Sequence, residues 1–238
     1  MQLLKILMLI CGLFWSVSQY AAVPKTLEIT PIEPQSPQEA TSKLDQRFKH
    51  SEQGGKPIVA LVLGSGGARG YAHIGVIQVL EKQGIHPDFI VGTSAGSIVG
   101  SLYASGMSAS KLRKVALDLK VADVREFKIG LKGFFDGGKV ENYVNQQVKQ
   151  QPLDKLKIPM YVVATELKSG KKTIFNYGNT GQAVRASVSI PSMFVPTVID
   201  GEEYVDGGLV SPVPVNIARD LGADIIIAVN ILAQPAYT

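Results

Sequence analysis

Four short, almost wholly apolar runs constrain the fold of this chain most. They read IVALVL (58–63), DFIVG (88–92), MYVVAT (160–165) and DIIIAVNI (224–231). Runs of this length without polar alternation are typical of strands covered on both faces, as in a parallel sheet. Helical patterns lie between them, and several of these end at glycine, as helices commonly do. The helical patterns are at 68–84, 97–106, 108–119, 139–150 and 214–222. We therefore predict an α/β fold of three layers, α/β/α, with a mostly parallel central sheet.

The first 56 of the 238 residues differ in composition from the rest. Residues 1–22 carry one lysine, an apolar run and then small residues, the pattern of a secretory signal peptide. The alternative is an uncleaved N-terminal anchor, because the apolar stretch is only just long enough to span a bilayer. Residues 23–56 are rich in Pro, Gln, Ser and charge and are expected to form a flexible linker. A single domain over 57–232 is expected to follow.

Composition excludes several classes of function. The formal net charge is +4, and the Lys and Arg residues are scattered, so we expect no nucleic-acid partner. The single cysteine, Cys11, lies in the predicted leader, so a cleaved chain would hold neither a disulfide nor a thiolate metal site. The three histidines are scattered as well. We therefore expect no metal site.

The stretch GSGGARG, residues 64–70, places four glycines between an apolar run and a helical pattern. Glycine there lets backbone N–H groups approach an anion, which can be a bound phosphate or the oxyanion of a reaction. A dinucleotide fingerprint needs a small residue where Arg69 stands, and no Gly-Lys-Ser or Gly-Lys-Thr follows to make a phosphate loop. A structural turn without a ligand is the remaining alternative.

A second motif, GTSAG, occupies residues 92–96 between an apolar run and a helical pattern. This context is typical of a nucleophile elbow, a tight turn that exposes a serine hydroxyl at a helix N-terminus. Ser94 is the candidate nucleophile, and Gly92 and Gly96 flank it.

The base for Ser94 cannot follow the α/β-hydrolase order of serine, acid and histidine, because every histidine precedes Ser94. His50 and His86 are expected to be solvated, and His73 is interpreted as a helix-surface or packing residue. A carboxylate is the better candidate. Asp206 precedes Gly207 and Gly208, so its side chain can reach into a site, although Asp-Gly-Gly is also a common turn.

The glycine stretch, the GTSAG elbow and the DGG turn, in this order, resemble the patatin-like phospholipases, above all the bacterial members. The resemblance covers residues 57–232 and implies a patatin-like fold, a Ser94–Asp206 dyad and no cofactor. It also implies an oxyanion hole at Gly66, Gly67, Ala68 and Arg69; the Arg69 side chain would orient the loop, attract an anionic head group or form a salt bridge. The other motif positions are Gly64, Ser65, Gly70, Gly92, Gly96, Gly207 and Gly208. Ser65 departs from the family, which has glycine there, but it still carries a backbone N–H, so we expect the oxyanion hole to survive.

The resemblance implies a serine lipid acyl hydrolase of phospholipase A or lysophospholipase type, acting on phospholipids or other lipid esters at a membrane surface. A transacylase with the same dyad and a non-catalytic lipid-binding module are the alternatives. The leader and the family together predict export to the bacterial periplasm or envelope membrane, or anchoring there by an uncleaved segment. Residues 123–139 carry Phe127, Phe134 and Phe135 without clean periodicity. They are interpreted as a mobile flap or as core aromatics under a long loop.

Overall fold

The computed structural model describes residues 55–120, 127–130 and 133–232; for 127–130 and 133–134 it describes the backbone only. The predicted leader and nearly all of the predicted linker lie outside the described residues. The strands are β1 (Val59–Leu63), β2 (Phe89–Thr93), β3 (Phe127–Gly130), β4 (Gly133–Phe135), β5 (Met160–Glu166), β6 (Lys172–Phe175), β7 (Thr197–Ile199), β8 (Glu202–Asp206) and β9 (Ile225–Val229).

Six α-helices connect the described strands: α3 (Tyr71–Lys82), α4 (Ala95–Ala104), α5 (Ala109–Asp118), α7 (Gly138–Gln147), α8 (Thr180–Val188) and α9 (Val215–Asp220). Short 3-10 helices are η2 (Gly67–Gly70), η3 (Leu153–Lys155) and η4 (Gly207–Leu209). Within the described residues, no helix is both long and apolar enough to cross a bilayer.

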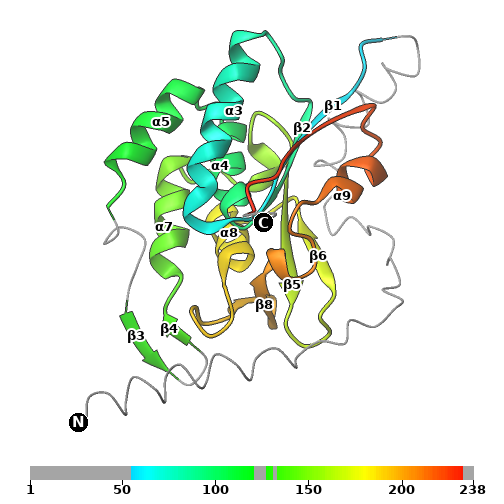
Figure 1. Cartoon of the computed structure of the whole chain (residues 1–238). Helices are drawn as coiled ribbons and strands as arrows, with labels where there is room; N and C mark the ends of the chain where they lie inside the picture. The colour runs from blue at the N-terminus through cyan, green and yellow to red at the C-terminus, as the bar shows by residue number, and fades with distance from the viewer. Residues whose placement is uncertain (1–54, 121–126, 131–132, 233–238) are drawn as a thin grey trace, which may run out of the picture. The chain divides into compact units, whose positions relative to one another are not determined.

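One seven-stranded sheet organises the described chain, in the order β7-β8-β5-β2-β1-β9, with β6 also pairing with β5. Strands β5, β2, β1 and β9 are parallel to one another. Strands β6 and β8 each pair antiparallel with β5, and β7 pairs antiparallel with β8. Figure 1 shows α3, α4, α5, α7 and α8 on one side of this sheet and α9 on the other. The predicted α/β fold of three layers is confirmed.

The burial pattern explains why the apolar runs become strands. Every residue of β2 is buried, and β1 is buried from Ala60 to Leu63, because helices cover both faces of the sheet centre. β9 is a sheet edge, and Ile225 is 46% exposed. The run at 224–231 is as apolar as the central runs, and its composition predicts a strand buried on both faces. In the described residues β9 is instead only partly buried.

Candidate active site

Ser94 lies in the tight turn between β2 and α4, with φ 52° and ψ −119°. This backbone conformation is rare for a non-glycine residue and must be held by its surroundings. Ser97 Oγ donates to the Ser94 carbonyl oxygen at 2.7 Å, and the Ser94 N–H donates to Ser187 Oγ at 2.8 Å. Ser187 Oγ in turn donates to the Val163 carbonyl of β5 at 2.6 Å. The turn is therefore bonded both to its own helix and to α8.

Close backbone packing explains two of the motif glycines. A Cβ on Gly96 would clash with the carbonyl oxygen of Leu63, at the end of β1. A Cβ on Gly207 would clash with the carbonyl oxygen of Val163. The first contact brings α4 against the sheet directly after Ser94, and the second brings the chain after Asp206 against β5. Glycine at these positions therefore lets the backbone next to each candidate catalytic residue pack directly against a strand, β1 in the first case and β5 in the second.

Strand register brings Asp206 to Ser94. In the ladders, Thr93 pairs with Val163 of β5, and Asp206 at the end of β8 pairs with the next residue, Ala164. Strand β6 pairs with Val162–Thr165 on the other edge of β5, so β2 and β8 lie one after the other along the same edge, and the end of β2 meets the end of β8. Ser94 directly follows the end of β2, and its Oγ donates to Asp206 Oδ2 at 2.7 Å. Both predicted residues are buried, 5% and 6% exposed.

The Asp206 carboxyl group is held by two donors and lies mostly out of solvent. Oδ2 accepts from Ser94 Oγ, and Oδ1 accepts from the Gly208 N–H at 2.7 Å. Burial raises the pKa of Asp206 above its ordinary value, and the hydrogen bonds from Ser94 and Gly208 offset part of that rise. A raised pKa makes the carboxylate a stronger base than aspartate in water, which suits proton abstraction from a serine.

The glycine stretch turns directly from β1 into η2. Gly67 has φ +57°, and Gly67, Ala68 and Arg69 are exposed. Gly67 and Ala68 begin the helical turn, and the first N–H groups of a helical turn have no acceptor within it. Such N–H groups are compatible with the predicted oxyanion hole, which stays a prediction.

Two positions in this stretch differ from the prediction. The Ser65 N–H is not free, because it donates to the Pro212 carbonyl at 2.8 Å. The Arg69 N–H donates to the Gly66 carbonyl at 3.2 Å, so it is not available to an oxyanion either. Of the three roles considered for the Arg69 side chain, its geometry matches orientation of the loop, since Nε donates to the Ile231 carbonyl at 2.7 Å.

His73 is buried rather than on a helix surface, and its Nε2 lies 2.8 Å from the Gly64 carbonyl oxygen. The prediction of a packing residue holds, and the surface alternative is wrong. His86 is exposed, as expected, and His50 lies outside the described residues.

The predicted aromatic segment at 123–139 falls partly outside the described residues. Its described part contains the two-stranded β3–β4 sheet, and the Phe135 ring lies 5.7 Å from that of Phe194. Phe135 also exchanges backbone hydrogen bonds with Met193 and Val195. Phe135 is thus fixed to the segment that follows α8.

Sequence reasoning missed the polar residues that hold the pair in place. Besides Ser187, Ser189 accepts the Asp206 N–H at its carbonyl, and Thr165 Oγ1 donates to the Asp206 carbonyl at 2.9 Å. These residues come from α8, the loop after it and β5, and no local motif marks them. Thr165 reaches the site through the register of β5 with β8, whereas Ser187 and Ser189 reach it because α8 packs against β5.

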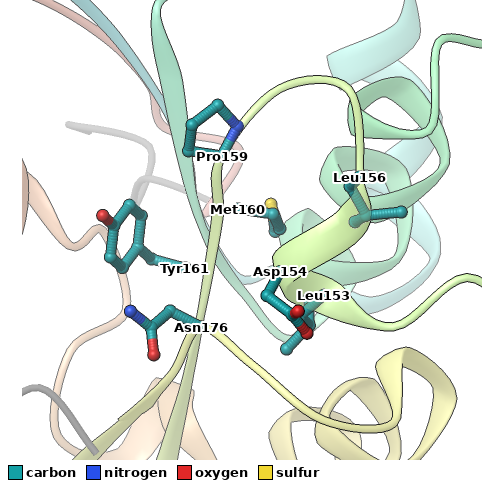
Figure 2. A pocket seen from close by; sticks show the side chains of 7 residues that line it. All are labelled: Leu153, Asp154, Leu156, Pro159, Met160, Tyr161 and Asn176. Atoms are coloured by element: carbon teal, nitrogen blue, oxygen red, sulfur yellow. The ribbon is translucent and has the colours of Figure 1, made fainter. Parts of the chain in front are cut away.

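A small pocket lies elsewhere in the fold, next to the beginning of β5. It is lined by Leu153, Asp154, Leu156, Pro159, Met160, Tyr161 and Asn176 (Figure 2). Ser94 and Asp206 meet beside Ala164, toward the other end of the strand. This pocket is therefore not part of the candidate active site.

Comparison with known families gives a match over most of the described chain. Residues 61–219 match the model of the family described as patatin-like phospholipase. An NTE family protein of Mycobacterium tuberculosis is 37% identical over 182 residues, which are 76% of this chain and 51% of that protein. Human patatin-like phospholipase domain-containing protein 6 is 32% identical over 185 residues, 74% of this chain and 13% of that protein. The chain thus spans about half the length of the mycobacterial relative.

Among solved structures, VipD from Legionella pneumophila matches with a TM-score of 0.57 and 16% identity, covering 64% of this chain and 46% of VipD. At this identity the match concerns the fold alone, and it agrees with the α/β architecture described above.

Proposed function

The chain belongs to the patatin-like phospholipase family, and we propose that it is a serine acyl hydrolase that cleaves carboxylic ester bonds of lipids through Ser94 and Asp206. One observation carries the proposal: a serine hydroxyl in a strained elbow donates to a buried carboxylate at 2.7 Å. Nucleophile and base within hydrogen-bond reach, with the base oriented by a further group, are the features that covalent catalysis requires. The Gly208 N–H is that orienting group.

In the proposed reaction, Ser94 Oγ attacks the ester carbonyl while its proton passes to Asp206 Oδ2. The negative charge that develops on the carbonyl oxygen is stabilised by backbone N–H groups of Gly66, Gly67 and Ala68. Asp206 then returns the proton to the departing alcohol, which leaves an acyl group on Ser94. Water then attacks this acyl-enzyme with Asp206 again as the base. As the bond between the acyl carbon and Ser94 Oγ breaks, Asp206 returns the proton to Oγ, which releases the fatty acid and restores the starting state.

Lipid esters of phospholipase A or lysophospholipase type are the proposed substrates, at an envelope membrane surface that the chain reaches by export or by an N-terminal anchor. Apolar side chains next in sequence to the site support a lipid substrate: Tyr71 follows η2 and is 55% exposed, and Leu209 follows the Asp206 turn and is 61% exposed. Such side chains favour contact with lipid over contact with water.

A transacylase would use the same residues and differ only in the acceptor of the acyl group. The hydrogen bond between Ser94 and Asp206 favours either enzyme over a non-catalytic lipid-binding module, because lipid binding alone requires no such pair.

The proposal is tested by fatty-acid release from phospholipid vesicles, with and without an added alcohol acceptor. We expect release by the wild type and loss of release in Ser94→Ala and Asp206→Asn. Two matched controls lie away from the site: Ser105→Ala at the end of α4 and the exposed Asp220→Asn at the end of α9. Transfer to the alcohol in place of free acid would indicate the transacylase, and release that is undiminished in Ser94→Ala would overturn the dyad.

A further inference from the structure

His73 is buried on α3 and is not hydrogen-bonded to the Ser94–Asp206 pair, yet it contacts the loop that carries the oxyanion donors. Its Nε2 lies 2.8 Å from the Gly64 carbonyl oxygen, and no described residue partners its Nδ1. A carbonyl oxygen can only accept a hydrogen bond, so Nε2 must carry the proton. The ring is therefore a donor directed at the start of the glycine stretch.

The hydrogen bond from His73 is one of two that hold the peptide group between Gly64 and Ser65 in place. The Gly64 carbonyl and the Ser65 N–H belong to the same planar peptide group. Its oxygen accepts from His73, and its N–H donates to the Pro212 carbonyl at 2.8 Å. Without one of these bonds, a peptide next to a glycine can rotate at little steric cost. With both bonds in place, its orientation is set immediately before Gly66.

The segment that binds the Ser65 N–H is also hydrogen-bonded to the residue before the nucleophile. Pro212 follows Ser211, whose carbonyl accepts from Thr93 Oγ1 at 2.9 Å, and Thr93 precedes Ser94. The segment 211–212 thus bonds both to the residue before the nucleophile and to the peptide before the predicted oxyanion donors. His73 holds that peptide from its other end.

We propose that His73 is a positioning residue for the oxyanion hole: its Nε2–H fixes the Gly64–Ser65 peptide plane and thereby aims the N–H groups of Gly66, Gly67 and Ala68. The inference rests on the proposed function, because it assigns an effect on the same reaction. Burial lowers the pKa of His73, which keeps the ring neutral and the Nδ1 unprotonated at neutral pH.

The test compares two replacements of His73. Glutamine keeps an N–H donor near the position of Nε2, whereas leucine fills space without a donor. With a soluble ester substrate, we expect His73→Leu to lower kcat by roughly 10- to 100-fold with little change in KM, as misplaced catalytic groups do. His73→Gln should recover most of that loss. Inhibition by a trifluoromethyl ketone, which forms an oxyanion on the enzyme, should weaken in parallel with kcat/KM.

A buried residue on the same helix serves as the control. Ile77→Ala is expected to lower Tm without lowering kcat, because Ile77 is fully buried on α3 but belongs to no part of the site. Unchanged kcat in a folded His73→Leu, or equal losses in His73→Leu and His73→Gln, would overturn the proposal.

A nitrogen-15 NMR spectrum of the wild type tests the geometry independently of activity and of how the variants fold. We expect one of the histidines to be a neutral Nε2–H tautomer at pH 7, and we expect its signals to change in His73→Gln; an Nδ1–H tautomer at His73 would contradict the proposal. If the wild type releases no acyl group and forms no ketone adduct, the proposed function fails instead, while the tautomer still reports on the peptide anchor.

Discussion

At the scale of single residues, Asp206 has two opposing requirements. It must be ionised to accept the proton of Ser94, yet it is buried, so its ionised form is costly. The Ser94 and Gly208 donors stabilise the carboxylate only in part. Burial of the carboxylate therefore lowers the free energy of unfolding, and it also makes Asp206 more basic than aspartate in water.

Replacing Asp206 by asparagine separates these two effects. Asparagine is uncharged and keeps an oxygen for the Gly208 N–H, so we expect activity to fall by roughly 10³-fold or more without loss of the fold. A carboxyl group whose pKa is raised by folding contributes most stability below its unfolded pKa and loses that contribution as pH rises through its folded pKa.

We therefore expect Asp206→Asn to have a higher free energy of unfolding than the wild type at pH 7, and this advantage should shrink as pH falls. Urea unfolding at several pH values measures it. A variant that is less stable at pH 7 by an amount independent of pH would contradict this account of the carboxyl group.

The raised pKa of Asp206 also predicts how the reaction rate falls at acidic pH. The kcat/KM for ester hydrolysis should fall as pH decreases, because protonated Asp206 cannot act as a base. The midpoint should lie above 3.8, the ordinary value for aspartic acid, since burial raises the pKa of Asp206. A pH–rate profile on a soluble ester measures this, and a midpoint below 3.8 would be inconsistent with a buried base.

At the scale of elements, the site depends on how closely α4 approaches β1. Gly96→Ala would push a Cβ into the Leu63 carbonyl, whereas Gly75, on α3, has open space around the same position. We expect Gly96→Ala to destabilise the protein by roughly 1–3 kcal/mol or more and to lower activity.

Gly75→Ala is the matched control within a helix and should stabilise the protein by roughly 0.5–1 kcal/mol, because alanine is the better helix former. Thermal unfolding of both variants measures the contrast. Equal effects in the two variants would show that the close approach of α4 to the sheet carries no special constraint.

The elements also show what the sequence could and could not predict. Apolar runs and glycine turns were sufficient for β1, β2, β5, α3, α4 and the elbow, because these features depend on local pattern. Helix α8 and the antiparallel strands β6 and β7 were not foreseen, since their segments mix polar and apolar residues without clear periodicity. Ser187 on α8 therefore remained hidden, and Thr165 was missed because no motif marks it on the predicted strand β5. Ser94 and Asp206 were found from their glycine neighbours.

At the scale of the whole molecule, a lipid substrate must reach a pair of buried side chains. Leu209 lies three residues after Asp206 and is 61% exposed. We expect Leu209→Asp to lower fatty-acid release from vesicles by about 5-fold or more, because a carboxylate resists entry into lipid. Hydrolysis of a soluble short-chain ester should change far less. Equal losses on both substrates would indicate damage to the site itself and not to lipid contact.

The central claim is that Ser94 is a nucleophile activated by Asp206, and reaction with a fluorophosphonate probe followed by peptide mass spectrometry tests it most directly. We predict a single phosphonyl adduct on the peptide that carries Ser94, no adduct in Ser94→Ala and much slower labelling in Asp206→Asn. An adduct on another residue, or labelling of folded Asp206→Asn at the wild-type rate, would contradict the claim.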